Sequence, residues 1–251
     1  MHPGRIILIG WVIYALLLAV ALARRAPRAK KKIPRQLSGP LRLLVIGATG
    51  GSGRELVEQA LKLGHQVTAL VRTPAKLTIQ HPNLRVVRGD VLDYTSVESA
   101  MESQDAVLCA LGHKKFFGPS SILSEGTRNL LRAMQSRPVP PRFICESSLG
   151  VGSAAGRLGL PALLVFVPLV LPFYFWDRVR QEKLIEGSDL DWVIVRPSVL
   201  TDGPERGAYR HGPNVGSYIL PTKISRADVA NFMLKQLHDD TYVGAAPGLC
   251  Y

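Results

Sequence analysis

The stretch that decides the fold is "LRLLVIGATGGSGRELVEQAL", residues 41–61. An apolar run typical of a buried strand breaks into glycines and then resumes at the spacing of an amphipathic helix. A tight strand-to-helix turn uses one glycine where the chain reverses, a second where a pyrophosphate approaches the backbone, and a third where the helix packs on the strand. The amides at the helix start then receive the phosphate charge. The stretch predicts a dinucleotide-binding turn rather than a purely structural one, and the residues predicted to line it are Gly47, Thr49, Gly50, Gly51, Ser52 and Gly53.

The chain after residue 40 alternates short apolar runs with helical patterns, which is the signature of a parallel sheet with crossover helices. The chain has 251 residues, 47% of them hydrophobic, enough for one large core. We expect an α/β protein with a Rossmann-like, doubly wound parallel sheet in a single domain, residues 41–251, preceded by an N-terminal transmembrane helix. The expected strands are 41–47, 66–71, 84–88, 105–111, 142–147 and 191–196, and the expected helices are 52–63, 94–101, 120–136, 176–187 and 226–238.

Arg72 ends the second expected strand, where a carboxylate would accept the ribose hydroxyls of NAD. A cation at that place suits the 2′-phosphate of NADP, so NADP(H) is the expected cofactor. The alternative is a solvated charge at the end of a strand.

The ends of the third and fourth strands supply further predicted contacts with the cofactor. The acid in "GDVLD" is placed to meet the adenine, and the glycine in "ALGHKK" lets the backbone close over the nucleotide. The charges that follow, His113, Lys114 and Lys115, either contact phosphate or are ordinary loop charges. The residues predicted to contact the cofactor at these two strand ends are Asp90, Val91, Leu111 and Gly112.

Residues 6–23, "IILIGWVIYALLLAVALA", hold no charge across 18 positions and are followed at once by "RRAPRAKKKIPR". This length is at the lower edge of what spans about 30 Å of hydrocarbon as a helix. One Lys or Arg precedes the segment and seven follow it, and this positive-inside bias puts the folded body in the cytoplasm. We expect residues 1–23 to be a signal anchor that makes the protein a single-pass membrane protein, and 24–40 to be a basic linker. A cleaved secretory peptide and an organelle transit peptide are the alternatives.

The formal net charge of +12 is concentrated in this leader, because residues 1–40 hold eight Lys or Arg and no acid. Residues 41–251 carry a charge of only +4, which argues against a nucleic-acid partner. The three cysteines show no metal-binding spacing, and no metal site is expected. Cys109 and Cys145 are expected to be buried free thiols, while Cys250 has no context that assigns it a role.

Several segments together resemble the atypical short-chain dehydrogenase/reductases, and within them the NAD(P)H-binding, NmrA-like group that includes biliverdin reductase B, a flavin reductase. They are "GATGGSG", the strand-end arginine, "GDVLD", "DAVLCALG", "SEGTRNLLRAM", "RFICESS", "DWVIVRPSVLTDGP" and "ISRADVANFML". The resemblance covers residues 41 to about 245. It implies a Rossmann fold with the cofactor across the carboxyl ends of the strands and NADPH as the hydride donor.

The resemblance also implies where catalytic groups would lie. Typical members use a Tyr and a Lys four residues apart, but here Lys183 has Val179 in the tyrosine place, so the usual proton donor is missing. Ser147 and Ser148 follow the fifth strand at the usual position of the catalytic serine; ending a strand is their alternative role. Lys183 holds ribose hydroxyls or is a helix-face charge. Two residues are expected to border the nicotinamide, Pro197 and Ser198.

Residues 158–176, "LGLPALLVFVPLVLPFYFW", contain no charge and three prolines. The prolines disfavour a second straight membrane span. We expect an apolar lid or a membrane-dipping surface instead. The sequence as a whole predicts an NADPH-dependent oxidoreductase that reduces a hydrophobic or conjugated acceptor. The alternative is an NADP(H)-binding redox sensor or assembly factor without catalytic activity.

Overall fold

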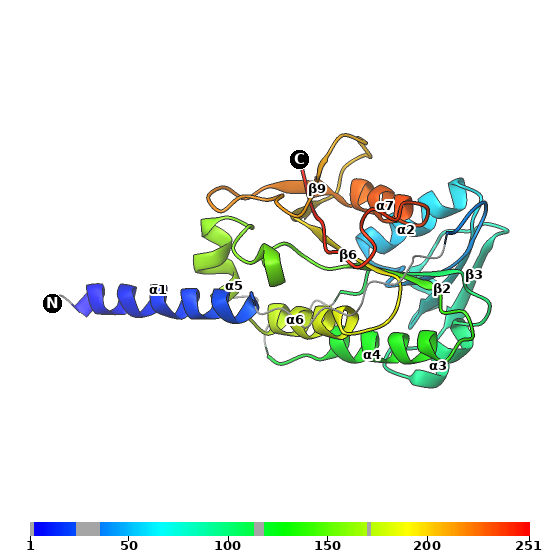
Figure 1. The fold of residues 1–251 in the computed structure, drawn as a ribbon, viewed down its shortest axis with the longest axis horizontal. Helices are drawn as coiled ribbons and strands as arrows, with labels where there is room; N and C mark the ends of the chain where they lie inside the picture. Colours follow the sequence, from blue (N-terminus) through cyan, green and yellow to red (C-terminus); the bar gives the residue numbers. More distant parts are fainter. Residues whose placement is uncertain (1–2, 24–35, 113–117, 170–171) are drawn as a thin grey trace.

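The computed structural model of the protein describes residues 3–23, 36–112, 118–169 and 172–251. Its centre is an eight-stranded sheet in the order β3-β2-β1-β4-β5-β6-β10-β8 (Figure 1). Two further short strands, β7 and β9, pair with each other. The strands are β1 Arg42–Ile46, β2 Gln66–Val71, β3 Leu84–Arg88, β4 Ala106–Cys109, β5 Arg142–Glu146, β6 Trp192–Pro197, β7 Val199–Thr201, β8 Arg210–Gly212, β9 Lys223–Ser225 and β10 Gly248–Cys250.

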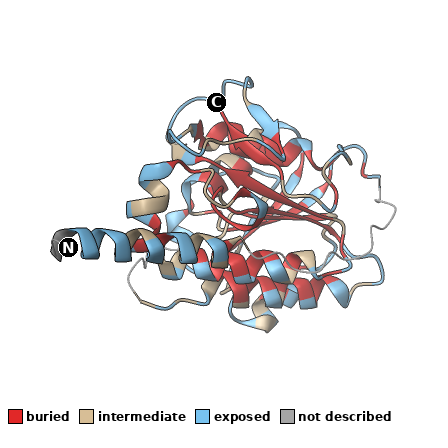
Figure 2. Ribbon diagram, turned by 60° about the vertical axis from the view of Figure 1, so that its left-hand side comes forward, coloured by how far each residue is buried: buried red, intermediate tan, exposed pale blue. Residues whose placement is uncertain are grey.

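Helices cover both faces of the sheet, with α2 and α7 on one face and α3, α4 and α6 on the other (Figure 1). The side chains of β1 show why: Leu43 and Val45 enter the core beneath α2 and α7, while Leu44 and Ile46 enter the opposite core. Figure 2 shows this burial on both sides of the strands. The helical segments are α1 Pro3–Leu22, α2 Gly51–Lys62, η1 Pro74–Lys76, α3 Tyr94–Ala100, α4 Ile122–Gln135, η2 Gly152–Ala154, the π-helix η3 Ala162–Phe166, α5 Val167–Leu169, α6 Pro172–Glu186 and α7 Arg226–Lys235.

The strand order reverses at β1, which pairs in parallel with β2 on one side and with β4 on the other. In an open parallel sheet, the crevice outside the carboxyl ends of the strands at such a reversal is where a ligand binds. The fold confirms the expected Rossmann-like, doubly wound sheet, and the six expected strands and five expected helices lie within a few residues of their predicted positions.

Leu37, within the expected linker 24–40, is buried in the core beside α2 and α7. Its carbonyl also contacts the ring of His238, with 2.9 Å between the oxygen and Nδ1. Most of the expected basic linker, residues 24–35, lies outside the described residues.

Among the described residues, α1 is the one straight helix long and apolar enough to cross a membrane. Its 18-residue window Arg5–Leu22 has a mean hydropathy of 2.4 and is 11% buried. Length and composition suit a membrane anchor, and they also suit a signal or transit sequence. The apolar residues 158–176 do not form one straight helix: Ala162–Leu169 and Pro172–Glu186 meet at 94°, a bend that runs over the undescribed residues 170–171.

Candidate cofactor site

The glycine turn after β1 is as tight as its sequence predicts. Gly47 has a φ of +82°, and a Cβ on it would lie 2.4 Å from the carbonyl oxygen of Ala110, beyond β4. A Cβ on Gly53 would lie 2.0 Å from the carbonyl oxygen of Gly47. Helix α2 begins at Gly51 with Gly50 as its N-cap, so its first amides lack acceptors within the helix and face the end of β1.

Two charged side chains that sequence reasoning missed lie beside this turn. Glu146, at the end of β5, accepts a hydrogen bond from Ser52 Oγ at 3.0 Å. Arg226, at the start of α7, lies against Gly51 and forms an ion pair with the exposed Asp202. The local sequence of "ISRADVANFML" marks a helix start but not its position, because α7 reaches the turn only when it packs against α2.

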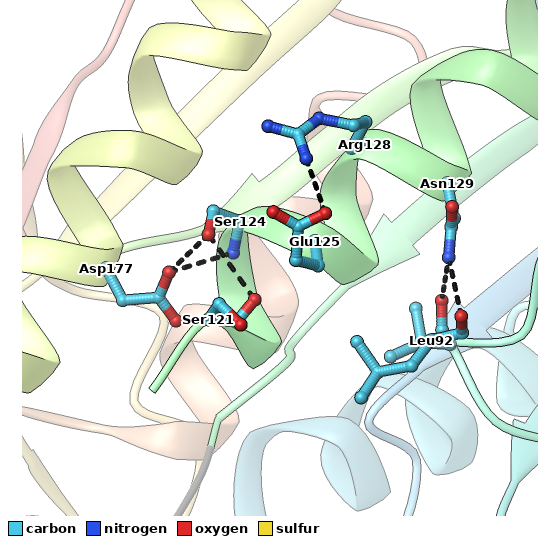
Figure 3. Close-up of polar contacts among 8 residues, drawn as sticks. Leu92, Ser121, Ser124, Glu125, Arg128, Asn129 and Asp177 are labelled. Atoms are coloured by element: carbon cyan, nitrogen blue, oxygen red, sulfur yellow. Dashed lines mark hydrogen bonds and ion pairs between the residues drawn. The ribbon is translucent and has the colours of Figure 1, made fainter. Parts of the chain in front are cut away.

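The predicted adenine end of the site lies at the ends of β2 and β3. Arg72 directly follows β2 and is exposed, as a residue that meets a ligand phosphate would be. The carboxylate of Asp90 accepts a hydrogen bond from the Leu92 amide at 3.0 Å. Val91 is buried, and its carbonyl, like that of Leu92, accepts a hydrogen bond from Asn129 Nδ2 at 3.0 Å (Figure 3).

The end of β4 leads toward α4, whose start is fixed by α6. The Asp177 carboxylate accepts hydrogen bonds from the amide and the hydroxyl of Ser124 (Figure 3). It also accepts one from the amide of Leu123. Leu111 is half-buried, and a Cβ on Gly112 would meet no protein atom within 4 Å. The loop at Gly112 therefore borders open space. The predicted contacts His113, Lys114 and Lys115 lie outside the described residues.

The two serines after β5 differ in environment. Ser147 is buried and donates a hydrogen bond to Glu182 Oε1 at 2.6 Å. The Arg196 guanidinium holds the same carboxylate through Nε at 2.9 Å and Nη2 at 2.7 Å. Ser148 is half-buried, and its hydroxyl donates to the carbonyl of Leu149 at 2.8 Å. Of the two serines, Ser148 is therefore better placed to contact a substrate.

Helix α6 contributes a tyrosine and an arginine one turn apart, at positions that the sequence did not suggest. The Tyr174 hydroxyl accepts hydrogen bonds from Arg178 Nη2 at 2.6 Å and Nε at 3.1 Å. Arg178 also donates to the carbonyl of Glu146 at 2.7 Å. The structure does not bring Lys183 into this network: Lys183 is exposed, while Val179 on the same helix is buried in apolar surroundings.

Burial raises the pKa of the Glu146 carboxyl above its usual range, against the opposing effects of the Arg178 charge and the Ser52 hydrogen bond.

At the end of β6, Pro197 is buried in the strand. The hydroxyl of the neighbouring Ser198 is buried and has no hydrogen-bond partner among the described residues. Such an orphaned hydroxyl at the carboxyl edge of the sheet suits contact with a polar ligand group.

These features fit a nicotinamide dinucleotide. The turn at Gly47 and Gly53 leaves no room for side chains, and the start of α2 offers amides to a pyrophosphate. Arg72 lies at one end of the strand edge, while Ser148 and Ser198 lie at the other. Among the residues that the structure describes, no three His, Cys, Asp or Glu side chains lie together as a metal site requires.

The doubly wound sheet, its reversal at β1 and the glycine turn define a Rossmann-fold protein with a dinucleotide site. The NAD(P)H-binding family matches residues 47–240, and the chain belongs to this family, in the NmrA-like group of atypical short-chain dehydrogenase/reductases. The resemblance found in the sequence is thereby confirmed.

The chain is 32% identical over 174 residues to the chloroplastic protein At2g34460 of Arabidopsis thaliana, which covers 66% of this chain and 61% of that protein. It is 26% identical over 260 residues to the reductase pytE of Aspergillus terreus, covering 82% of this chain and 96% of that protein. The solved structure of the anaerobillin reductase ChuY from Escherichia coli superposes with a TM-score of 0.69 at 23% identity, over 83% of this chain and 96% of that one. The family match shows an NAD(P)H-binding protein, and the likeness to ChuY shows the fold.

Proposed function

We propose that this protein is a membrane-anchored, NADPH-dependent oxidoreductase that reduces a hydrophobic acceptor. The observation that carries the proposal is the glycine turn of β1 and α2, flanked by two arginines, Arg72 and Arg226. NADPH supplies the hydride. Arg72 binds the 2′-phosphate, and Arg226 exchanges Asp202 for the pyrophosphate.

The acceptor lies beside the half-buried residues Ser148 and Tyr174. Tyr174 packs against the apolar cluster that contains Leu149, the residue after Ser148. The Ser148 hydroxyl orients the acceptor oxygen. The Tyr174 hydroxyl, held by Arg178, or a water molecule supplies the proton. Proximity and orientation supply most of the rate.

Helix α1 is the membrane anchor, and the body lies on the cytoplasmic side. The basic residues that follow residues 6–23 support this orientation. The uncharged segment 158–176 supplies part of the apolar cluster that holds Leu149, including Tyr174, which favours a lipophilic acceptor.

The test is NADPH oxidation by the full chain in lipid nanodiscs, measured against a panel of quinones, flavins and lipid carbonyls. We expect turnover with at least one lipophilic acceptor, and loss of that turnover in Ser148→Ala with NADPH affinity retained. Loss of turnover in Tyr174→Phe would assign the proton to Tyr174, and turnover retained in that variant would assign it to water. Tight NADPH binding without turnover on the whole panel would instead support a redox sensor that does not catalyse. That outcome would also agree with Val179 in the tyrosine place.

A further inference from the structure

One face of α1 packs against the body. Ala15 and Leu22 are buried and Leu18 is partly buried, which is the spacing of a single helix face. On the other faces, Leu17 and Val20 are 65% and 64% exposed. The packed face meets the apolar cluster of the loops that follow β5, and this places the C-terminal half of α1 at the carboxyl edge of the sheet.

Trp11 ties α1 to the body by a hydrogen bond. Its indole N–H donates to the carbonyl oxygen of Leu164, in η3, at 2.7 Å. Trp11 precedes Leu22 by eleven positions, which corresponds to about 16 Å along a helix. A hydrocarbon core is about 30 Å thick, so if α1 spans it, η3 reaches roughly half of that depth.

The chemistry of the segment that contains η3 suits such a depth. Residues 158–176 carry no charged side chain, and six large apolar residues in this segment are 44% to 58% exposed. Backbone polar groups in hydrocarbon need a partner, and Trp11 supplies one for Leu164. The exposed apolar residues are Leu160, Val165, Phe166, Leu169, Phe173 and Trp176.

A third apolar segment, residues 218–220, continues this surface. Ile219 and Leu220 are 67% and 69% exposed. The Leu160 amide donates to the carbonyl of Ile219 at 3.2 Å, so the loop before β9 lies beside residues 158–176. In Figure 1, α1 projects from the side of the body on which α5 and this loop lie.

We propose that the carboxyl edge of the sheet docks on the bilayer through the apolar residues 158–169 and 172–176, a re-entrant element held beside α1, with residues 218–220 at its margin. The bilayer is the occupant because this surface is continuous with α1, a helix of spanning length that carries no charge after Arg5. The inference rests on the proposed anchoring by α1. Its consequence is that a lipophilic acceptor passes from the membrane to the loops after β5 without crossing water.

The experiment uses the full chain in vesicles that contain lipids brominated on their acyl chains, with an environment-sensitive fluorophore on single introduced cysteines. The three native cysteines are buried, so the introduced one is the site that reacts. Phe166→Cys reports on the re-entrant element and Leu17→Cys on α1. The matched control is Leu63→Cys, because Leu63 is 62% exposed, close to the 58% of Phe166, and follows α2 at the opposite edge of the sheet.

We expect the probes at residues 17 and 166 to shift to the blue and lose most of their emission to the brominated lipid, while the probe at residue 63 does neither. Quenching at residue 17 without quenching at residue 166 would overturn the docking and leave the anchor intact. Absence of quenching at both would overturn the anchor and the docking together. Shielding at residue 166 that persists in lipid-free detergent, with cross-links between chains, would assign the surface to a second copy and also overturn the proposal.

Discussion

The side chain of Arg226 lies directly against Gly51, the first residue of α2. A Cβ on Gly51 would come within 2.4 Å of Arg226 Cδ and 2.6 Å of its Nε. The guanidinium therefore sits beside the amides that would bind a pyrophosphate, and its ion pair with the exposed Asp202 competes with that ligand.

Replacing this arginine tests its part in cofactor binding. We expect Arg226→Gln to weaken binding of NADPH and NADH alike, by about 5- to 30-fold, because both contain the pyrophosphate. Asp202→Asn removes the competing carboxylate, so it should tighten binding of both. Calorimetric titration measures each affinity, and unchanged binding in Arg226→Gln would remove Arg226 from the site.

The glycines of the turn should differ sharply in their tolerance of a methyl group. A Cβ on Gly53 would meet the backbone oxygen of Gly47 at 2.0 Å, and neither segment can move without opening the turn. We expect Gly53→Ala to destabilise the fold by more than about 3 kcal/mol. Gly51→Ala meets only the flexible side chain of Arg226, so it should fold normally and bind the nucleotide weakly. Thermal unfolding and nucleotide titration of both variants decide this, and equal stability would argue against the close packing at Gly53.

Most of the strands that the sequence predicted are buried on both faces, and the exception is the edge strand β3, which has no buried residue. Strands β1, β2, β4, β5 and β6 contain long apolar runs because helices cover both sides of the parallel sheet. Strands β7 to β10 have three residues each, too few for any periodicity, and their pairing depends on distant segments. Cys250, for which the sequence indicated no role, lies buried in β10 beside β8.

The candidate site likewise contains features that local sequence predicts and features that depend on contacts between distant segments. The glycine turn is local and could be predicted, whereas Ser52 and Glu146 come together across 94 positions through the order of the strands. Helix α6 begins at Pro172, four residues before the predicted start, so Tyr174 lay outside the expected helix. The start of α6 belongs to the uncharged segment 158–176. Its sequence is apolar on every side, so it does not indicate which face of the helix packs against the sheet.

Arg72 should decide between the two nicotinamide nucleotides. We expect Arg72→Ala to weaken NADPH binding by about 10- to 100-fold through loss of a charge-assisted contact with the 2′-phosphate, and to leave NADH binding unchanged. Arg85→Ala is the control, because Arg85 is exposed near the amino end of the adjacent strand β3. Equal losses for both nucleotides would show that Arg72 does not read the 2′-phosphate.

The buried pair of Glu182 and Arg196 should matter for stability more than for binding. Glu182→Gln removes the nearer carboxylate of the buried Arg196 guanidinium and leaves Glu186, at 3.8 Å, as an ion-pair partner, so we expect a loss of up to about 3–5 kcal/mol. Glu125→Gln is the matched control, because its pair with Arg128 is exposed and should contribute little (Figure 3). Thermal unfolding measures both changes. Similar losses of stability in the two variants would show that the buried ion pair contributes no more to stability than the exposed pair.

The last prediction concerns pH and follows from Glu146. Burial raises the pKa of this carboxyl in the folded protein above its ordinary value of 4.5, so the folded state holds the proton more tightly than the unfolded chain. The stabilisation from Glu146 is therefore fully present below the unfolded pKa and is lost as the pH rises through the folded pKa. Gln does not titrate and can still accept the hydrogen bond from Ser52.

We therefore expect the stability of Glu146→Gln relative to the unmodified protein to increase as the pH is raised from about 4 through the folded pKa. Chemical unfolding at a series of pH values measures this difference. Glu58→Gln, on the exposed face of α2, provides the baseline for an ordinary carboxylate. A relative stability that stays flat, or that falls as the pH rises, would show that the charge of Arg178 outweighs burial at this carboxyl.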